Sequence, residues 1–569
     1  MENTNYQDLL DLCSTLDAET VSRAKEATRF LWDTTAYTNA TNMSLDDLEI
    51  DPLTLRHTGF TALEEQAMAR NISPLVGPPR GAVYGFKIPE ILKERCRPVW
   101  ACYLNEELDT VGYKLQSQQR IWRDLHGAVR VIAFDGKSMY DQFPLSQEIK
   151  NFFAFRLRDG TTACLSHLPM GFGPACEIAQ LCALILASFE CHHPQFSVRP
   201  LVHIDNFAFI ITPTSSTWTP QELEVFSSTI ISKFFQRCLS VNFQLNEASK
   251  TEIEHYLSAT PELQEHLHKE WCPSQFVLLG IHYDLVAKTR EIAPKTTKKL
   301  EAIRNIMFKN GSIQKNITPR QIAVAFGVAR WAARSISYKH CHYKLFEAAS
   351  NLGALMHSKP ELWDKPLAST AQFGELASWY SSLLENKPTP IWHLVPDNSP
   401  VLIVDACSTG WGGVLVHNDA VKIASGQWES EIESSTESEP KGTLAALKKL
   451  DIRSTDIIIV TDHEPLIFAA QSQQAHGWFY YSLLNSLKSM WPKCHFHFTF
   501  VEGIHNPADA PSRGREMEEH HTTGYCRAMA AAAGMGASWA LLNPSRDIPG
   551  LLVSSSFDAN QLPLLPSFW

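Results

Sequence analysis

The sequence predicts an α+β protein of several domains, and three observations support this prediction. The chain has 569 residues, which is too long for a single hydrophobic core. Apolar residues make up 44% and charged residues 20% of the chain, as in folded proteins. Apolar runs of strand length alternate with helix-length segments in two stretches, about 84–290 and 400–515.

We expect five segments along the chain. Residues 291–395 show a helical and basic pattern, and the loop ENKPTPIWHLVPDNSP separates it from the second α/β stretch. The sequence gives no legible role to either end of the chain. The expected segments are an N-terminal helical extension at 1–80, an α/β segment at 81–290, a basic helical segment at 291–395, a second α/β segment at 396–515 and a C-terminal tail at 516–569.

The termini, the apolar runs and the cysteines indicate the compartment. The longest apolar run, 178–189, has about half the length of a bilayer crossing, so we expect a buried helix and no membrane partner. The N-terminus is acidic and lacks the apolar core of a signal peptide. Thirteen cysteines without regular spacing fit reduced thiols. We therefore expect an intracellular protein, cytoplasmic and/or nuclear.

Cysteine and histidine gather in three short stretches, ECHH (190–193), KHCHYK (339–344) and KCHFHF (493–498). None of them pairs a CxxC with a second half-site, which structural zinc sites usually require. KCHFHF also alternates as a strand does. We therefore do not predict a structural metal from these stretches.

Positive charge is concentrated in one part of an acidic chain. The net charge is −11, yet residues 288–344 contain thirteen Lys and Arg against Glu291 and Glu301, a local charge of +11. The rest of the chain then carries −22. A solvated charged face usually mixes both signs, so this segment favours contact with a polyanion such as nucleic acid.

The stretch LVHIDNFAFI (201–210) places Asp205 and Asn206 between two apolar runs. Taken alone, it predicts a β-hairpin that turns at Asp205-Asn206. A second aspartate, Asp135, ends the apolar strand RVIAFD about seventy residues earlier. Two carboxylates delivered by neighbouring strands are suited to bind a pair of divalent cations. The Gly/Pro-rich turn HLPMGFGPACEIAQ (167–180) lies between them and permits close backbone approach.

With these motifs, residues 85–290 resemble the reverse transcriptases of LTR-type retroelements, most nearly the gypsy and DIRS types. The resemblance implies a right-hand polymerase with fingers, palm and thumb. The matching residues are Arg97 in the fingers strand RPVWACYLN, Asp135 followed by Tyr140, the LPxG turn Leu168, Pro169, Met170 and Gly171, the YxDD hairpin His203, Ile204, Asp205 and Asn206, the lysine Lys250 that ends VNFQLNEASK, and the hairpin FVLLGIHYD (276–284).

The resemblance also implies roles for these residues. Asp135 and Asp205 would bind two Mg²⁺ or Mn²⁺ ions, with Asn206 beside them in the catalytic hairpin. Tyr140 would exclude a 2′-hydroxyl. Arg97, Tyr140, Met170, Gly171 and Lys250 would bind the incoming dNTP. The partners would be an RNA template and a DNA/RNA primer–template duplex, whose backbone would contact the thumb residues Lys295, Lys298, Lys299 and Arg304.

The hairpin departs from the family at two positions, where Asn206 replaces the second Asp and His203 replaces the Tyr. An amide oxygen ligates a divalent ion but adds no negative charge. We therefore expect weakened catalysis rather than its loss.

A second group of acids follows in the second α/β segment. Asp405 lies on a strand in VLIVDACSTGWGGVLV, Asp462 ends the strand IIIVTD, and Asp509 begins a late segment in HNPADAPSRG. This arrangement resembles the ribonuclease H domain that follows reverse transcriptases, in which four acids bind two Mg²⁺ ions and cleave the RNA strand of a hybrid.

The fourth acid is the difficulty. The family places a glutamate at the start of an ELxA run about twenty residues before the second aspartate, and the residue at that distance from Asp462 is Gly442. Glu439, one helical turn earlier, is the substitute ligand to consider, with Glu437 near it and Pro440 between. The expected ribonuclease H activity is therefore impaired.

Two functions follow from these patterns. The leading one is an RNA-directed DNA polymerase of retroelement origin with a linked, impaired ribonuclease H. The alternative is a domesticated or decayed relative that binds nucleic acid, or acts as a scaffold, without catalysis. Asn206 and Gly442 favour the alternative, whereas the retained aspartates favour the enzyme. The sequence leaves the oligomeric state open.

Overall fold

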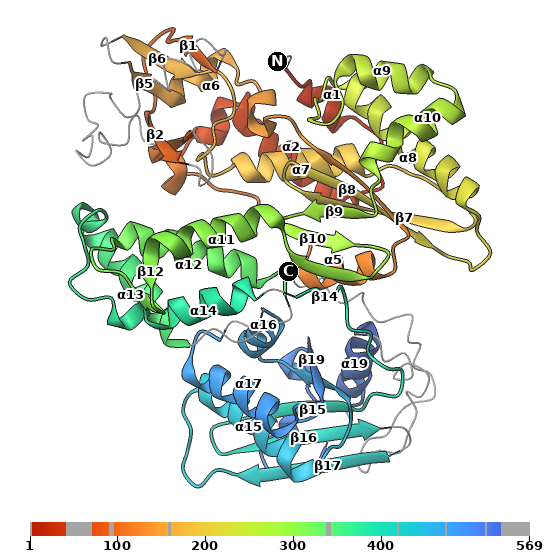
Figure 1. The fold of residues 1–569 in the computed structure, drawn as a ribbon, viewed down its shortest axis with the longest axis vertical. Coiled ribbons are helices and arrows are strands. Elements are labelled where there is room, and N and C mark those ends of the chain that lie inside the picture. Colours follow the sequence, from red (N-terminus) through yellow and green to blue (C-terminus); the bar gives the residue numbers. More distant parts are fainter. Residues whose placement is uncertain are drawn as a thin grey trace. The chain divides into compact units, whose positions relative to one another are not determined.

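The computed structural model describes residues 3–40, 71–89, 96–157, 161–336, 343–385, 387–417, 420–472, 475–517 and 521–535 (Figure 1). The chain divides into two compact units: residues 1–289 form nearly all of the first, and residues 290–567 form the second. Helices and sheets contribute to both units. The predicted α+β, multidomain class is confirmed.

The first unit contains a three-stranded sheet of order β4-β8-β7, formed by β4 (Arg130–Asp135), β8 (Asn206–Pro213) and β7 (Phe196–His203). Both neighbouring pairs are antiparallel. Two helices, α7 (Ala175–Ala187) and α8 (Pro220–Ser240), contribute side chains to the same core. Phe134, Phe207 and Phe234 pack their rings together there. The apolar run at 178–189 forms most of α7 and is buried, as predicted.

The other elements of the first unit surround this sheet. The two-stranded sheet β2-β3 contains part of the stretch RPVWACYLN, which the resemblance assigns to the fingers, and the three-stranded sheet β1-β6-β5 includes a strand, β1, from the segment expected to be a helical extension. The elements are α1 (Tyr6–Leu10), α2 (Ala18–Thr28), η1 (Arg29–Leu31), η2 (Thr34–Tyr37), β1 (Ile72–Pro74), β2 (Val83–Pro89), β3 (Cys96–Cys102), η3 (Tyr103–Glu106), α5 (Gln118–His126), η4 (Met139–Gln142), α6 (Gln147–Lys150), η5 (Asn151–Phe153), β5 (Ala154–Arg156), β6 (Thr162–Leu165), α9 (Lys250–Ser258), α10 (Pro261–His268), η6 (Lys269–Trp271), and the antiparallel pair β9 (Gln275–Leu278) and β10 (Ile281–Asp284).

The second unit begins with a helical part. Helices α11, α12 and α14 pack against one another, and the hydroxyl of Tyr380 donates to the carbonyl of Ala325 at 2.7 Å. The elements are β11 (Thr289–Ile292), which spans the division between the units, α11 (Pro294–Met307), the hairpin β12 (Phe308–Lys309) and β13 (Ser312–Ile313), α12 (Pro319–Ala333), α13 (Tyr343–Ser358), η7 (Pro360–Leu362), η8 (Ala371–Phe373), α14 (Glu375–Leu384) and β14 (Thr389–Pro390).

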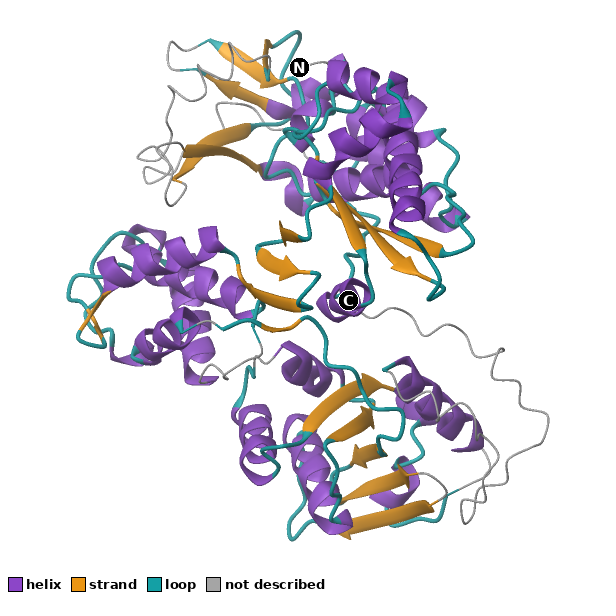
Figure 2. Ribbon diagram, turned by 45° about the vertical axis from the view of Figure 1, so that its right-hand side comes forward, coloured by secondary structure: helices purple, strands orange, loops and turns teal. Residues whose placement is uncertain are grey.

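A five-stranded sheet of order β17-β16-β15-β18-β19 follows in the second unit (Figure 2). Strands β15 (Val401–Ala406), β16 (Gly410–His417) and β17 (Ala420–Gln427) are antiparallel neighbours. Strands β18 (Asp456–Thr461) and β19 (His495–Phe500) continue the sheet in the direction of β15. Sheets of this order and these directions are typical of ribonuclease H-like α/β domains.

Helices cover both faces of this sheet (Figure 2). One face packs against α15 (Ser435–Leu450), α16 (Glu464–Ser472) and α17 (Trp478–Met490). The other face packs against α19 (His521–Gly534) through Tyr525, Ala528 and Met529. Two short helices, η9 (Gly503–His505) and α18 (Asp509–Ser512), follow β19. Residues expected in the C-terminal tail thus supply a helix that covers a core.

Among the residues that the structure describes, no helix combines the length and the apolar character that a membrane crossing requires.

Candidate active sites

The first candidate site lies at the turn between β7 and β8. His203 pairs with Asn206 across the hairpin, so the two turn residues are Ile204 and Asp205. The hairpin is therefore present, but the predicted turn at Asp205-Asn206 was wrong by one residue. Ile204 adopts a φ of 58°, a left-handed conformation that is strained for a β-branched residue. Something other than the turn's own preference must hold it.

The buried side chain of Gln180, on α7, holds this turn. Its amide nitrogen donates to the carbonyl of Val202 at 3.1 Å, and its carbonyl oxygen accepts from the amide of Ile204 at 2.6 Å. These two hydrogen bonds fix the backbone on one side of Asp205. Sequence reasoning missed Gln180, because its contact with the hairpin depends on how α7 packs.

The hairpin brings Asp205 to the end of β4. Asp135 pairs with Asn206 in the register of the two strands, and the amide of Gly136 donates to the carbonyl of Asp205 at 2.6 Å. The backbones of the two predicted metal ligands, Asp135 and Asp205, are thus neighbours. Asn206 donates from its side-chain amide to the Asp205 carboxylate at 2.9 Å, so it acts here as a hydrogen-bond donor.

A third carboxylate, that of Glu247, lies beside Asp135. The Glu247 carboxylate accepts from the amide of Asp135 at 2.8 Å, and the amide of Asn246 donates to the Asp135 carbonyl at 2.9 Å. Burial, followed by the charges of Glu247 and Asp205, raises the pKa of Asp135 to about 6. The sequence analysis singled out Lys250 in this stretch and missed Glu247, three residues earlier.

The residues predicted to bind the nucleotide lie in different surroundings. Tyr140 is partly buried, and its hydroxyl lies 3.1 Å from the sulfur of Cys176 on α7. Burial, followed by this hydrogen bond, raises the pKa of Tyr140. Gly171 has a φ of +107°, and a Cβ there would lie 2.0 Å from the carbonyl oxygen of Trp100. Close approach of β3 therefore requires glycine at 171, whatever its part in nucleotide binding.

The structure says less about the other three residues that are predicted to contact the nucleotide. Met170 precedes this glycine, and its carbonyl accepts from the amide of Trp100 at 2.8 Å. Arg97 lies within β3, opposite Ile88 in the register, and its side chain lies outside the described residues. Lys250 is exposed at the first position of α9. Their roles at the nucleotide stay predictions.

The second candidate site is formed by carboxylates from distant parts of the second unit. Asp405 comes from β15, Glu439 from α15 and Asp462 from the residue after β18. One ligand atom from each of them lies within 4.8 Å of the other two. Asp509, at the start of α18, lines the same open pocket of about 670 Å³. The structure thus brings the three predicted aspartates to one pocket.

The carboxylates of this site are crowded and mostly buried. Burial, followed by repulsion from Asp462 and Asp509, raises the pKa of Asp405 to about 7, although Ser512 donates to it at 2.5 Å. Burial and the charges of Asp405 and Asp462 raise the pKa of Glu439 to about 9. Asp509 differs from them, since it accepts from the guanidinium of Arg513 at 2.9 Å.

Glu439, and not position 442, provides the fourth carboxylate. A Cβ on Gly442 would lie 2.9 Å from that of Ala406, so no larger side chain fits there. Counting back twenty residues from Asp462 therefore leads to a position without a carboxylate, whereas Glu439, one helical turn earlier, lies beside Asp405 and Asp462. Helix α15 continues through Pro440.

Glu437 points elsewhere, since its carboxylate pairs with Lys441 on the exposed side of α15. Glu439, by contrast, is only 6% exposed, and its buried Oε2 atom has no hydrogen-bond partner in the described part of the chain. A buried carboxylate oxygen without a partner is costly unless a cation balances it. The donor set of this pocket therefore fits a hard divalent cation such as Mg²⁺.

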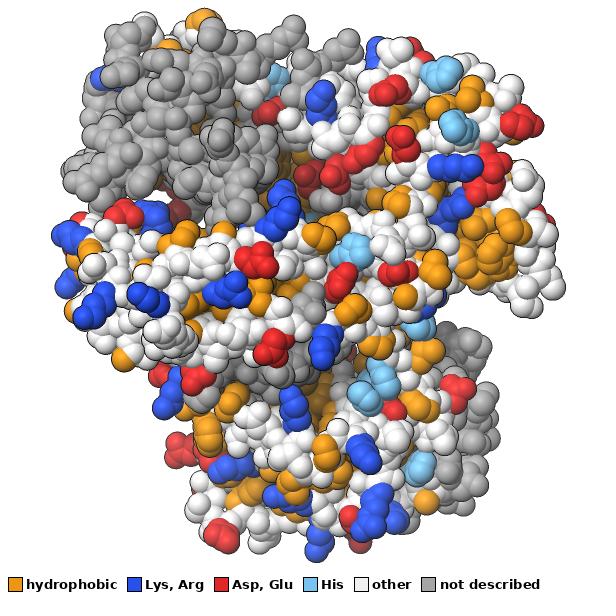
Figure 3. Space-filling view, in the orientation of Figure 1, with side chains coloured by type: hydrophobic (Ala, Val, Ile, Leu, Met, Phe, Trp, Pro, Cys, Tyr) orange, Lys and Arg blue, Asp and Glu red, His pale blue; other side chains and the backbone are white. Residues whose placement is uncertain are grey.

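Some of the positively charged side chains of the basic segment make contacts with other residues of the protein. Arg290 is buried against the carbonyl of Ile391, Lys288 donates to the carbonyl of Ala128, and Arg320 pairs with Asp364 at 2.7 Å. The exposed surface over α11 to α13 still shows more Lys and Arg than Asp and Glu (Figure 3). Lys295, Lys298 and Arg304 of α11 are exposed, and Lys299 is partly exposed.

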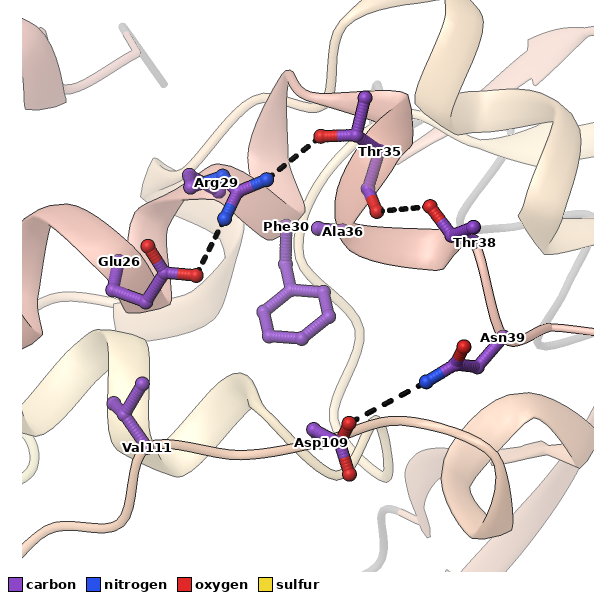
Figure 4. Close-up of a pocket in the computed structure, with 9 residues that line it drawn as sticks. All are labelled: Glu26, Arg29, Phe30, Thr35, Ala36, Thr38, Asn39, Asp109 and Val111. Carbon is purple, nitrogen blue, oxygen red and sulfur yellow. Dashed lines mark hydrogen bonds and ion pairs between the residues drawn. The ribbon is translucent and has the colours of Figure 1, made fainter.

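A separate hollow of about 180 Å³ lies among the N-terminal helices and residues 109–111 (Figure 4). Its polar groups pair with one another: Arg29 contacts Glu26 at 2.5 Å and Thr35 at 2.7 Å, and Asn39 donates to Asp109 at 3.4 Å. It contains none of the predicted site residues, and its internal pairing leaves no convergent groups for a ligand.

The fold and the two carboxylate groups define an α+β chain of several domains with a candidate divalent-metal site in each unit. No protein-family model matches the chain, and no curated protein matches its sequence.

Solved structures similar to the chain include three of the foamy viral protease-reverse transcriptase. The dRH form in complex with double-stranded DNA is 13% identical, with a TM-score of 0.39, over 87% of this chain and 81% of that one. The complex with an RNA/DNA hybrid is 14% identical, with a TM-score of 0.39, over 87% and 62%. A further complex with double-stranded DNA is 12% identical, with a TM-score of 0.37, over 87% and 96%.

Proposed function

We propose that the chain is an RNA-directed DNA polymerase of retroelement origin with a linked ribonuclease H. The observation that carries the polymerase proposal is the hairpin turn, which sets Asp205 beside Asp135 through the 2.6 Å hydrogen bond between Gly136 and the Asp205 carbonyl. Its proposed substrates are dNTPs and a primer annealed to an RNA template.

In this proposal Asp135 and Asp205 bind Mg²⁺ or Mn²⁺, and Asn206 orients the Asp205 carboxylate by its hydrogen bond. The bound ions, two per site, would activate the 3′-hydroxyl and stabilise the triphosphate. Tyr140 limits the space at the sugar, and its hydrogen bond to Cys176 on α7 holds the ring in place. Arg97, Met170, Gly171 and Lys250 bind the nucleotide.

Primer extension on a poly(rA) template tests the polymerase. We expect the wild-type chain to extend the primer, and we expect Asp135→Asn and Asp205→Asn to reduce incorporation by at least about a hundredfold, as for the loss of other strong electrostatic contributions. Asp11→Asn, an exposed aspartate that follows α1, is the matched control and should be unchanged. Equal incorporation by all four proteins would refute the polymerase proposal.

The ribonuclease H proposal rests on the group Asp405, Glu439 and Asp462, with Asp509 in the same pocket. These residues would hold Mg²⁺ beside the RNA strand of a hybrid, and Asn506 steadies Asp462 by donating to it at 3.3 Å. Because Glu439 completes the acid set, the proposed activity is intact rather than impaired. This revises the expectation drawn from Gly442.

Cleavage of a labelled RNA strand in an RNA–DNA hybrid tests this second activity. We expect Glu439→Gln to lower the rate by at least about a hundredfold, because the site loses a charged ligand. Glu437→Gln lies two residues away on the same helix, pairs with Lys441 outside the pocket, and should cleave as the wild type does. Equal loss in both variants, or in neither, would contradict the role of Glu439.

The alternative is a non-catalytic nucleic-acid-binding or scaffold protein, and the hydrogen bond from Asn206 to Asp205 favours it. The hydrogen bond from this uncharged amide stabilises the ionised Asp205 carboxylate, which lowers the need for a cation at the hairpin. The same assays separate the two functions. Duplex binding without extension and without hybrid cleavage, in Mg²⁺ and in Mn²⁺, would establish the alternative.

A further inference from the structure

Two histidines and an aspartate meet at one edge of the five-stranded sheet, outside both carboxylate sites. Asp456 is the first residue of β18, and its register partner in β19 is His495. His497 lies two residues further along β19, on the same side of the strand as His495. His393 comes from the segment between β14 and β15.

The three side chains converge on one point. The Nε2 atom of His393 lies 2.7 Å from Oδ1 of Asp456, and the Nε2 atom of His497 lies 2.9 Å from the same oxygen. The three candidate ligand atoms all lie within 4.8 Å of one another. The Asp456 side chain is 4% exposed and that of His497 is 11% exposed, whereas that of His393 is 44% exposed. The cluster is thus closed on the sheet side and open to water at His393.

The surrounding residues hold this arrangement in place. The ring of His495 stacks on that of His393, with 4.0 Å between their centroids. Ile391 and Val395, two residues before and after His393, are both buried. His393 itself is exposed, and its hydrogen bond to Asp456 directs its ring toward the cluster.

We infer that His393, Asp456 and His497 form a binding site for Zn²⁺ or a similar transition-metal dication, with water as the fourth ligand. Two imidazole nitrogens and one carboxylate oxygen are ligands that zinc prefers, whereas Mg²⁺ prefers oxygen alone. Zinc–ligand distances of about 2.0–2.1 Å place tetrahedral ligand atoms about 3.3 Å apart. The two nitrogen–oxygen spacings, 2.7 and 2.9 Å, would need to widen by about 0.5 Å, which side-chain rotation supplies.

The bound ion would link the segment between β14 and β15 to the first residue of β18 and to β19. The site is independent of the proposed polymerase and nuclease activities, since none of its ligands belongs to either carboxylate group. It also revises the expectation that KCHFHF carries no metal. The stretch does form a strand, as predicted, but it supplies one ligand of a site whose other members come from elsewhere in the chain.

Zinc binding to the full chain tests this inference. The protein is stripped with a chelator, dialysed against Zn²⁺ in an excess of Mg²⁺, and its zinc is measured by mass spectrometry. We expect one zinc per wild-type chain, and less than about a tenth of that in His393→Gln and His497→Gln. The controls His417→Gln, whose ring bonds to the carbonyl of Asn398, and Glu439→Gln at the second carboxylate site should each retain one zinc.

Two further measurements keep the test decisive if a variant folds poorly. Zinc should raise the unfolding temperature of the stripped wild-type chain, and Co²⁺ should give it the visible absorption bands of a tetrahedral site. Both effects should be lost in His393→Gln, whose half-exposed side chain can be replaced with little disturbance to the core. A wild-type chain that retains no zinc, or full retention in both His393→Gln and His497→Gln, would overturn the inference.

Discussion

At the scale of single residues, the two carboxylate sites differ in how their negative charge is balanced. Asn206 donates to Asp205 in the first site, and Arg513 donates to Asp509 at the rim of the second. Inside the second site Glu439 has a buried oxygen that finds no hydrogen-bond partner among the residues that the structure describes. The second site therefore depends more strongly on a cation than the first does.

The variant Asn206→Asp tests what the amide does at the hairpin. It replaces a hydrogen-bond donor by a second carboxylate, which should bind Mg²⁺ more tightly and raise primer extension at limiting Mg²⁺ by about tenfold, the equivalent of 1.4 kcal/mol. Without metal the same variant should be less stable, because two carboxylates then repel each other. Asn5→Asp, at the N-cap of α1, is the control. Unchanged Mg²⁺ dependence would show that position 206 lies outside the metal's reach.

The raised pKa values of Asp405 and Glu439 predict a pH dependence of stability in the metal-free protein. Their pKa values, about 7 and about 9, lie above those of unfolded carboxyl groups, so the folded state binds more protons between these limits. The free energy of unfolding should therefore fall as the pH rises from about 5 to about 9.

Unfolding temperatures at several pH values check this expectation. Glu439→Gln has no proton to lose and should show a shallower fall than the wild type, and Mg²⁺ should reduce the fall more in the wild type than in Glu439→Gln. Glu437→Gln should behave as the wild type. Identical pH profiles for the wild type and Glu439→Gln would show that the Glu439 carboxyl does not titrate in this range.

At the scale of elements, helix α7 sets the geometry of the turn between β7 and β8. The turn residue Ile204 has an unfavourable φ of 58°, and Gln180 makes hydrogen bonds with the amide of Ile204 and with the carbonyl of Val202 before it. The strain at the turn is therefore offset by hydrogen bonds from another element.

Replacing Gln180 should disturb the turn without touching a carboxylate. Gln180→Leu leaves the amide of Ile204 and the carbonyl of Val202 without their partner, which should cost about 1–3 kcal/mol in the free energy of unfolding. Urea unfolding measures this loss, and primer extension should fall with it. Gln195→Leu, near the far end of β7, serves as a control. Full stability and activity in Gln180→Leu would show that the turn keeps its conformation without the hydrogen bonds from Gln180.

Some features of the helices and strands could be predicted from the sequence, and others could not. Apolar alternation was enough for the hairpin, the buried helix α7 and the strand in KCHFHF, because these depend on local pattern. The position of the turn was not, since Ile204 is an unfavourable residue there and the helix that holds it is distant in sequence. Glu439 was found only as one of two candidates, because loop length, which the pattern does not fix, decides the count from Asp462.

At the scale of the whole molecule, positive charge is concentrated on α11 although part of the basic segment is used internally. The exposed residues Lys295 and Lys298 lie one turn apart, whereas Arg290 is buried and Arg320 is paired with Asp364 at the surface. The local charge of +11 therefore overstates the charge available for a nucleic acid. Only contacts between distant residues separate the two groups, which composition alone does not reveal.

Salt dependence of duplex binding tests this surface. If Lys295 and Lys298 each contact a phosphate, the double variant Lys295→Ala/Lys298→Ala should lower the slope of log K against log salt by about 2. Lys359→Ala/Lys365→Ala removes the same charge from exposed positions of the second unit and should leave the slope unchanged. Equal changes in the two double variants would indicate a general effect of charge rather than contact at α11.

The histidine cluster could not be predicted from the sequence, because its members come from distant parts of the chain. His393 and His497 lie 63 and 41 residues from Asp456, and no motif spacing joins them. Sheet register and the path of the segment before β15 create the cluster. It was found only once the strands were placed.

Helix α19 has a practical consequence for handling the protein. It covers Val401, Ile403 and Val460 with Tyr525 and its neighbours. A chain shortened after residue 515, at the end of the expected second α/β segment, would present that apolar face of the sheet to water. Such a protein should self-associate and elute as aggregates in gel filtration, whereas a chain that ends after residue 535 should stay soluble.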